Sequence, residues 1–185
     1  MKRLLPILLF SLAPVWTVNA AVCSSSSATV NVPDTTPTSR FSIQKDANEN
    51  HLTVIDNQTG LEWAACPFGY SWDLGIGACT SSGSPGLTWT GALLQAVQAN
   101  HDTYLGKQGW RVPNIKELAS IVEYKCSDPA INNEVFGITD PTTFWSNTHV
   151  TGDTSYIRVV DFNTGLIYTD LRTNSHYLRL VRDVN

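Results

Sequence analysis

The chain has 185 residues, of which 42% are hydrophobic and 15% are charged, and its formal net charge is -4 at pH 7. This length suits one domain with a substantial core. The mildly acidic balance, without a basic run, argues against nucleic acid as a partner and against adhesion to anionic membranes by bulk charge. After residue 20 no stretch is long and apolar enough to span a bilayer, so attachment to a membrane would be peripheral at most.

The first 20 residues have the pattern of a cleavable signal peptide. Lys2-Arg3 precedes an apolar run over residues 4–16, and Val18-Asn19-Ala20 follows as a cleavage site. The run is too short for a membrane anchor and contains two prolines. Lipidation at Cys23 is disfavoured because a valine precedes it where a small residue is needed. We therefore expect an exported protein that is periplasmic, displayed on the cell surface or secreted.

Four cysteines follow the predicted cleavage site: Cys23, Cys66, Cys79 and Cys126. An even number in an exported chain indicates two disulfides, and three pairings are possible. Because Cys66 and Cys79 enclose a Gly-rich loop, we expect them to pair locally and Cys23 to pair with Cys126. The cysteine spacings fit no zinc pattern, and the four histidines are scattered along the chain.

Residues 21–39 are rich in Ser, Thr and Pro and have little to bury, so they are predicted to be a leader that Cys23 ties to the domain. The globular domain is expected over residues 40–185. Its first elements are two strands that flank a tight turn at residues 56–60. Residues 66–86 hold five glycines and two prolines and are predicted as a disulfide-stapled loop rather than a regular element.

Two helices are expected next. Thr88 is the predicted N-cap of the first helix. Its apolar face would consist of Trp89, Ala92, Leu93, Ala96 and Val97. Asn114 is the predicted N-cap of the second, where Glu117 three residues on completes a capping box. The buried stripe of that helix would be Ile115, Leu118, Ala119 and Val122.

From Phe144 onward the pattern changes to short strands. Residues 156–162 are β-branched and aromatic, residues 163–165 form a turn, and residues 166–168 return. A last strand is expected over residues 177–182. The order of elements predicts a single α+β domain with two helices and a small, mostly antiparallel sheet.

Four segments, in this order, resemble one known family. They are Asp56 to Trp63, Gly109 to Leu118, Phe144 to Ser146, and Tyr177 to Arg182. Together they are similar to the Legionella collagen-like protein C-terminal domain family, over roughly Arg40 to Arg182. The resemblance implies a C-type-lectin-like fold, close to the variant found in formylglycine-generating enzymes. It also implies an exported bacterial protein, since several members are implicated in surface binding, including adhesion to sulfated polysaccharides.

Within this resemblance, the best-matched positions are structural rather than functional. They are Trp63, Trp110, Arg111, Pro113, Glu117 and Trp145. Tryptophans of this kind bury large apolar areas and anchor a core. We expect Arg111 to form an internal ion pair with Glu117 or with Glu62. Some relatives with this fold have a C-terminal stretch that is randomised by diversity-generating retroelements.

No enzyme is expected. The sequence lacks the nucleophile-elbow, zinc-helix and phosphate-loop motifs, and formylglycine-generating enzymes depend on a late pair of reactive cysteines, whereas Cys126 is the last cysteine here. No cofactor is required by any pattern. A structural calcium ion remains open because several loop residues offer hard oxygen ligands, although without a fixed spacing. They are Asp128, Asn132, Asn133, Glu134, Asp140 and Asp153.

The predicted ligand site lies in the C-terminal stretch between His149 and Tyr177, because its residue types combine contact area with hydrogen bonding. The predicted ligand-binding residues are Tyr156, Arg158, Asp161, Tyr168, Asp170, Arg172, Asn174 and His176. Residues 156–182 carry four arginines and two aspartates, so an anionic glycan could bind there. We expect a non-catalytic module that binds a glycan or a protein. The alternative is a structural component of a cell-surface fibre or complex.

Overall fold

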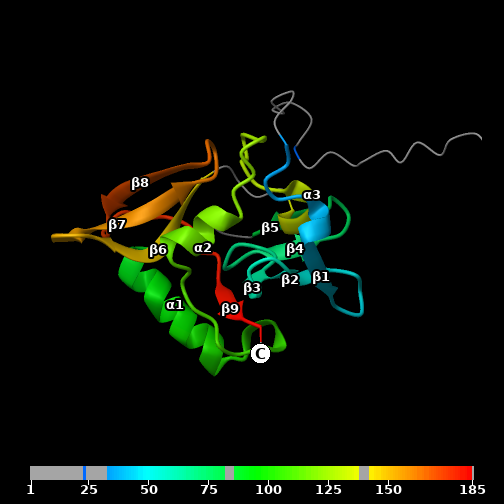
Figure 1. The fold of residues 1–185 in the computed structure, drawn as a ribbon. Helices are drawn as coiled ribbons and strands as arrows, with labels where there is room; N and C mark the ends of the chain where they lie inside the picture. The colour runs from blue at the N-terminus through cyan, green and yellow to red at the C-terminus, as the bar shows by residue number, and fades with distance from the viewer. Residues whose placement is uncertain (1–22, 24–32, 82–85, 138–141, 185) are drawn as a thin grey trace, which may run out of the picture.

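The computed structural model describes residue 23 and residues 33–81, 86–137 and 142–184 (Figure 1). The predicted signal peptide lies outside these residues. Within them the chain forms three antiparallel sheets and three α-helices, so the α+β class is confirmed. The sequence predicts one small sheet and two helices, which is fewer sheets and helices than the structure contains.

The first sheet joins the two ends of the domain. Its strands, in the spatial order β1-β2-β3-β9, are β1 (Phe41–Lys45), β2 (His51–Asp56), β3 (Leu61–Ala64) and β9 (Val181–Asp183). The predicted strand–turn–strand unit is therefore confirmed in β2 and β3. Asp56 shapes its turn by accepting hydrogen bonds from the Gln58 amide and the Thr59 hydroxyl, at 3.0 and 2.7 Å. Gly60 closes the turn with a φ of +71°, which glycine adopts without steric cost.

The last strand is shorter than predicted. Instead of forming one continuous ladder, the backbone of residues 177–180 pairs with several segments. The Tyr177 amide donates to Thr143, while the Leu178 and Leu180 carbonyls accept from Phe68 and Ala64. The residues that pair in register with β3 as a strand are Val181–Asp183. This segment therefore ties the two larger sheets together.

The sequence predicts that residues 66–86 form a loop without regular elements, and this prediction is wrong. They contain a second, two-stranded sheet, β4 (Ser71–Asp73) and β5 (Ala78–Thr80). Trp72 lies opposite Cys79, and Cys79 is linked to Cys66. The disulfide and the cross-strand pairs stabilise strands that are too short to be recognised from periodicity.

The helices largely follow their predicted caps. The Thr88 hydroxyl accepts a hydrogen bond from the Gly91 amide at the start of α1 (Trp89–His101). Asn114 and Glu117 form the predicted capping box of α2 (Ile115–Ser120). A third helix, α3 (Asn133–Phe136), was not predicted. Two 3-10 turns complete the set: η1 (Thr38–Arg40) and η2 (Tyr104–Gly106). Among the described residues, no helix has the length and hydropathy needed to cross a membrane.

The buried face of α1 differs in part from the prediction. Ala92 and Ala96 are buried as expected, but Val97 is 68% exposed and Ala99 is buried instead. Small residues on this face allow the helix to lie close to the rest of the molecule. Val122 is buried, but it lies beyond the end of α2 rather than on its stripe.

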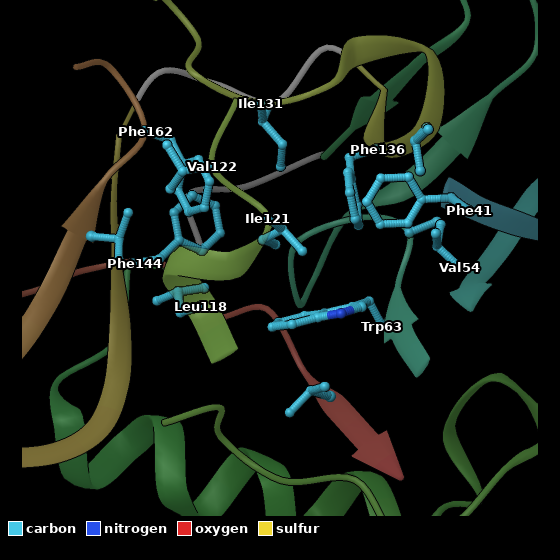
Figure 2. Close-up of a cluster of buried hydrophobic side chains, with 14 of the residues drawn as sticks. Phe41, Val54, Trp63, Leu118, Ile121, Val122, Ile131, Phe136, Phe144 and Phe162 are labelled. Carbon is cyan, nitrogen blue, oxygen red and sulfur yellow. The ribbon is translucent and has the colours of Figure 1, made fainter. Parts of the chain in front are cut away.

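The third sheet, in the order β6-β7-β8, lies away from the first (Figure 1). Its strands are β6 (Thr143–Val150), β7 (Asp153–Asp161) and β8 (Leu166–Leu171). A cluster of buried side chains fills the space between the two sheets. Ile121 lies near its centre, with Phe41 and Phe136 on one side, Leu118 and Phe144 on the other, and Trp63 below (Figure 2). A second cluster joins Trp145 of β6 to the alanines of α1.

Both predicted disulfides are present: Cys66–Cys79 and Cys23–Cys126. Near the second, residues of the predicted leader are hydrogen-bonded to the domain. The Thr36 amide and hydroxyl donate to Glu123 at 2.7 and 2.9 Å, and Thr35 donates to the same carboxylate at 3.1 Å. The Glu123 side chain is therefore the buried attachment point of this segment.

We expect Glu123 to make the stability of the domain sensitive to acid. Burial alone would raise its pKa, but the donors of Thr35, Thr36 and Lys125 hold the pKa below its ordinary value. A carboxyl whose pKa is lower in the folded state stabilises the fold above its unfolded pKa of about 4.3, and that stability is lost as pH falls further. Urea unfolding of wild type and Glu123→Gln between about pH 3 and 7 measures this effect. The variant should be less stable at pH 7 and less sensitive to acid. Parallel pH profiles would contradict the assignment.

Candidate functional site

One face of the third sheet presents Tyr156 and Arg158 to solvent. The register places Tyr156 opposite Leu171 and Arg158 opposite Thr169, so these four side chains share one face. Tyr156 is 37% and Leu171 39% exposed. The intervening Ile157 is fully buried, which is the alternation expected from the sequence. We call the surface formed by Tyr156, Arg158, Thr169 and Leu171 the Tyr156 face.

The opposite face carries a different set of predicted residues. Val159 lies between Trp145 of β6 and Tyr168 of β8, and these three side chains define the Trp145 face. Val159 and Trp145 are fully buried, whereas Tyr168 is 41% exposed. The Tyr168 and Thr143 hydroxyls are hydrogen-bonded at 2.7 Å. This bond fixes the tyrosine at the edge of the sheet.

Asp170 organises a small polar cluster on the same side. Its carboxylate is 2.7 Å from His176 Nε2 and accepts a hydrogen bond from the Asn174 amide at 2.8 Å. Burial would raise the pKa of Asp170, but these hydrogen bonds hold the pKa below its ordinary value. The His176 ring packs edge-on against Trp145, with 4.5 Å between ring centroids. The cluster thus fixes the segment that follows β8.

The two remaining predicted residues have separate positions. Asp161 accepts hydrogen bonds from the Asn163 amide at 2.9 Å and the Thr164 hydroxyl at 2.8 Å, so its carboxylate shapes the turn between β7 and β8. The Arg172 side chain is exposed, and the backbone carbonyl of Arg172 accepts a hydrogen bond from the Trp89 amide at the start of α1. The eight predicted residues therefore do not converge on one site.

Residues 156–182 present less positive charge at the surface than the sequence predicts. Arg179 is fully buried, and Arg182 pairs with Glu62. Only Arg158 and Arg172, of the four arginines in residues 156–182, have exposed side chains. This stretch is consequently a poorer match for an anionic glycan than its composition indicates.

The residues predicted to be structural do lie in the scaffold. The side chains of Trp63 and Trp145 are fully buried and Trp110 is 3% exposed. The Trp145 and Trp110 indoles donate to the backbone carbonyls of Leu87 and Tyr104, at 2.6 and 2.9 Å. The first bond ties β6 to the segment just before α1, and the second ties Trp110 to η2, and both tryptophans belong to the second core cluster.

Arg111, Pro113 and Glu117 occupy one junction of this scaffold. Arg111 makes two hydrogen bonds to the Glu117 carboxylate, at 2.7 and 3.0 Å, so Glu117 rather than Glu62 is its main partner. Pro113 is buried, and its carbonyl accepts from the Asn147 amide. The junction holds the start of α2 against β6.

A pocket of about 250 Å³ lies elsewhere, between the first sheet, the β4–β5 hairpin and η2. Its aromatic lining comes from His51, Tyr70, Trp72 and Tyr104. Sequence reasoning missed it because these residues come from three separate segments. The cluster Tyr70-Ser71-Trp72 inside a Gly-rich stretch is the signal that could have drawn attention to it.

The oxygen ligands considered for calcium mostly serve local structure. The Asn132 side chain caps α3 and donates to the Thr36 carbonyl, Glu134 accepts from the Thr38 hydroxyl, and Asp153 accepts from the Ser155 amide. Asp140 lies outside the described residues. In the part of the chain that the structure describes, no three His, Cys, Asp or Glu residues are grouped as metal ligands would be.

Comparison with known proteins identifies a family. A family model described as the Lcl C-terminal domain matches residues 52–182, which is more than half of the chain. The matched region runs from β2 into β9 and contains the third sheet and the β4–β5 hairpin, whereas β1 and the pocket residues Asp46, Asn50 and His51 precede it. Comparison with curated proteins found no match.

Proposed function

Because the chain belongs to the Lcl C-terminal domain family, we propose that it is an exported, non-catalytic binding module of adhesin type. It would work at the cell surface or after secretion. The family and the two disulfides are compatible with either location. Its ligand would be a protein or a glycan held by the Tyr156 face. No cofactor is part of this proposal.

The observation that carries the proposal is the exposure of large apolar side chains on β7 and β8. On the side of the sheet that carries the Tyr156 face, the exposed residues are Tyr156, Ile167 and Leu171, whereas Leu166 and Tyr168 are exposed on the opposite side. Soluble proteins rarely expose contiguous apolar patches without an interaction to cover them. Tyrosine and arginine are enriched among the residues that dominate binding energy, and Tyr156 and Arg158 lie on the same face. An apolar surface of this kind favours a protein ligand over an anionic glycan.

The cysteine chemistry supports a non-catalytic role. All four cysteines are in disulfides, so no thiol is free for the chemistry of formylglycine-generating enzymes. That analogy, already weakened by the lack of late cysteines, has no nucleophile to act through.

The test compares a three-residue variant of the Tyr156 face with a two-residue control variant on α1. The Tyr156-face variant is Tyr156→Ala/Arg158→Ala/Leu171→Ala. The matched control is Leu94→Ala/Val97→Ala, which removes exposed apolar side chains from α1. Each exposed substitution should change stability by only about 0.5 kcal/mol. Affinity for a captured cell-surface protein should fall at least about 30-fold in the Tyr156-face variant, as loss of an anchor worth about 2 kcal/mol predicts.

The ligand is sought by binding the mature domain to cell-surface protein extracts and to a glycan array. The control should bind as wild type does. Equal affinity of both variants would place the ligand site elsewhere, and a ligand found only on the glycan array would replace the protein assignment.

A structural role in a surface assembly is the second candidate, and one observation favours it. β8 is an edge strand of its sheet and carries exposed Leu166 and Ile167. Exposed edge strands with apolar side chains are templates for pairing with another chain. Self-association that depends on protein concentration, together with no binding in either screen, would favour this role. Analytical ultracentrifugation of wild type and Ile167→Lys measures it.

A further inference from the structure

The pocket between the first sheet and the β4–β5 hairpin is separate from the Tyr156 face and has rigid walls. The rings of His51 and Trp72 are stacked, with centroids 3.8 Å apart. A Cβ at Gly137 would come within 2.6 Å of the Trp72 ring, so the backbone there lies directly against the indole. Tyr104 packs against Phe68 and Trp110 on the other side. These contacts fix the aromatic walls before any ligand arrives, which lowers the entropic cost of binding.

Polar side chains line the same region. They are Asp46, Asn50 and Ser71. They add a carboxylate, an amide and a hydroxyl, a set that both donates and accepts hydrogen bonds.

The charge of the pocket opposes an anion. Asp46 is its acidic lining residue, and hydrogen bonds from Asn50 hold the pKa of this carboxyl below its ordinary value. No lysine or arginine is among the residues that line the pocket. A polar molecule with hydroxyl groups can donate hydrogen bonds to the Asp46 carboxylate without bringing a negative charge near it.

Two loops at the pocket have unusual backbone conformations. Glu49, Thr103 and Leu105 all have positive φ, at 67°, 52° and 52°. Only one other non-glycine residue in the described chain, Asp128, shares this feature. Leu105 itself lines the pocket, and Glu49 adjoins the lining residue Asn50. Strained backbone of this kind concentrates at ligand sites, where the surrounding structure holds it in place.

We propose that this pocket binds one uncharged sugar ring, such as the terminal unit of a glycan. A cavity of about 150 Å³ takes a benzene-sized ring, so about 250 Å³ holds a six-membered ring with its hydroxyl groups. Rigid aromatic walls with a few converging polar groups are the usual form of a small-ligand site. The ring carbons would contact Tyr70 and Tyr104, and the hydroxyls would pair with Asp46, Asn50 and Ser71.

The test is an NMR titration of the full mature domain with glucose, galactose, mannose and N-acetylglucosamine. The indole N–H signal of Trp72 reports directly on the pocket. At least one sugar should shift it in a saturable manner. Asp46→Asn should weaken that binding, because the amide accepts hydrogen bonds less strongly than the carboxylate. Absence of a saturable shift with all four sugars would overturn the proposal.

Two variants separate the pocket from the rest of the surface. Ser71→Phe fills the pocket from its exposed lining position and should weaken sugar binding about tenfold or more. Ser42→Phe makes the same change on β1, outside the pocket, and should bind as wild type does. Equal losses in the two variants would overturn the assignment, as would a Trp72 shift with tetramethylammonium and with no sugar. None of these readouts depends on the Tyr156 face, so the two proposals can fail independently.

Discussion

Replacing Arg179 with alanine is expected to destabilise the domain by about 4 kcal/mol, a large part of a typical stability of 5–15 kcal/mol. The Arg179 side chain is fully buried, and its guanidinium donates to the carbonyls of Ala64 and Ala65. It also lies over the rings of Phe136 and Phe144, at 5.1 and 5.7 Å from their centroids. Alanine would remove these contacts, leave a cavity and deprive two carbonyls of a donor.

The choice of replacement identifies which contribution dominates. Burial lowers the pKa of Arg179 to about 9, so the group is still charged at neutral pH and its desolvation opposes folding. Arg179→Met keeps most of the volume and removes that charge, so it should be milder than alanine by about 2 kcal/mol. Arg179→Lys keeps the charge but not the planar fork that reaches two carbonyls. Urea unfolding followed by tryptophan fluorescence gives all three values.

A methionine variant as unstable as the alanine variant would contradict this account. It would mean that the hydrogen bonds to Ala64 and Ala65, rather than the filled volume, hold the segment between the sheets. If Arg179→Ala were as stable as wild type, the cost of burying the guanidinium charge would nearly equal the stabilisation from the contacts of Arg179.

Local chemistry explains which parts of the fold could be predicted from the sequence. The caps at Thr88 and Asn114 depend on side chains within three residues of the backbone groups they bond, so the helix starts were correct. The turn after Asp56 depends on equally local hydrogen bonds. The strands β4 and β5 have three residues each, which is too short for an alternating pattern to be distinguished from a loop.

The candidate site was harder to predict because it depends on pairing between distant segments. Composition counts Arg179 and Arg182 as surface charge, but the fold buries the first and pairs the second with Glu62. Likewise, only the register of β7 with β8 shows that Tyr156 and Tyr168 lie on opposite faces. The pocket at His51 and Trp72 joins segments that share no sequence motif.

Removing the Cys23–Cys126 disulfide is expected to cost more than removing Cys66–Cys79. The two bridges close loops with sequence separations of 103 and 13 residues. In the chain-entropy account, a loop of about 100 residues corresponds to about 4.7 kcal/mol and one of about 15 residues to about 3 kcal/mol. All four cysteines are 5–9% exposed, so the packing lost on mutation is similar for the two pairs and the difference reflects the unfolded chain.

The measurement compares Cys23→Ala/Cys126→Ala with Cys66→Ala/Cys79→Ala by urea unfolding at neutral pH. The Cys23→Ala/Cys126→Ala variant should have a free energy of unfolding about 2 kcal/mol lower than the Cys66→Ala/Cys79→Ala variant. It should also show the steeper dependence on urea, since an unfolded chain without the long-range bridge exposes more surface. Glu123→Gln serves as the control, because it weakens the docking of Thr35 and Thr36 while leaving the bridge intact. Equal losses for the two disulfide variants would show that strain or residual structure, rather than loop length, determines what each bridge contributes.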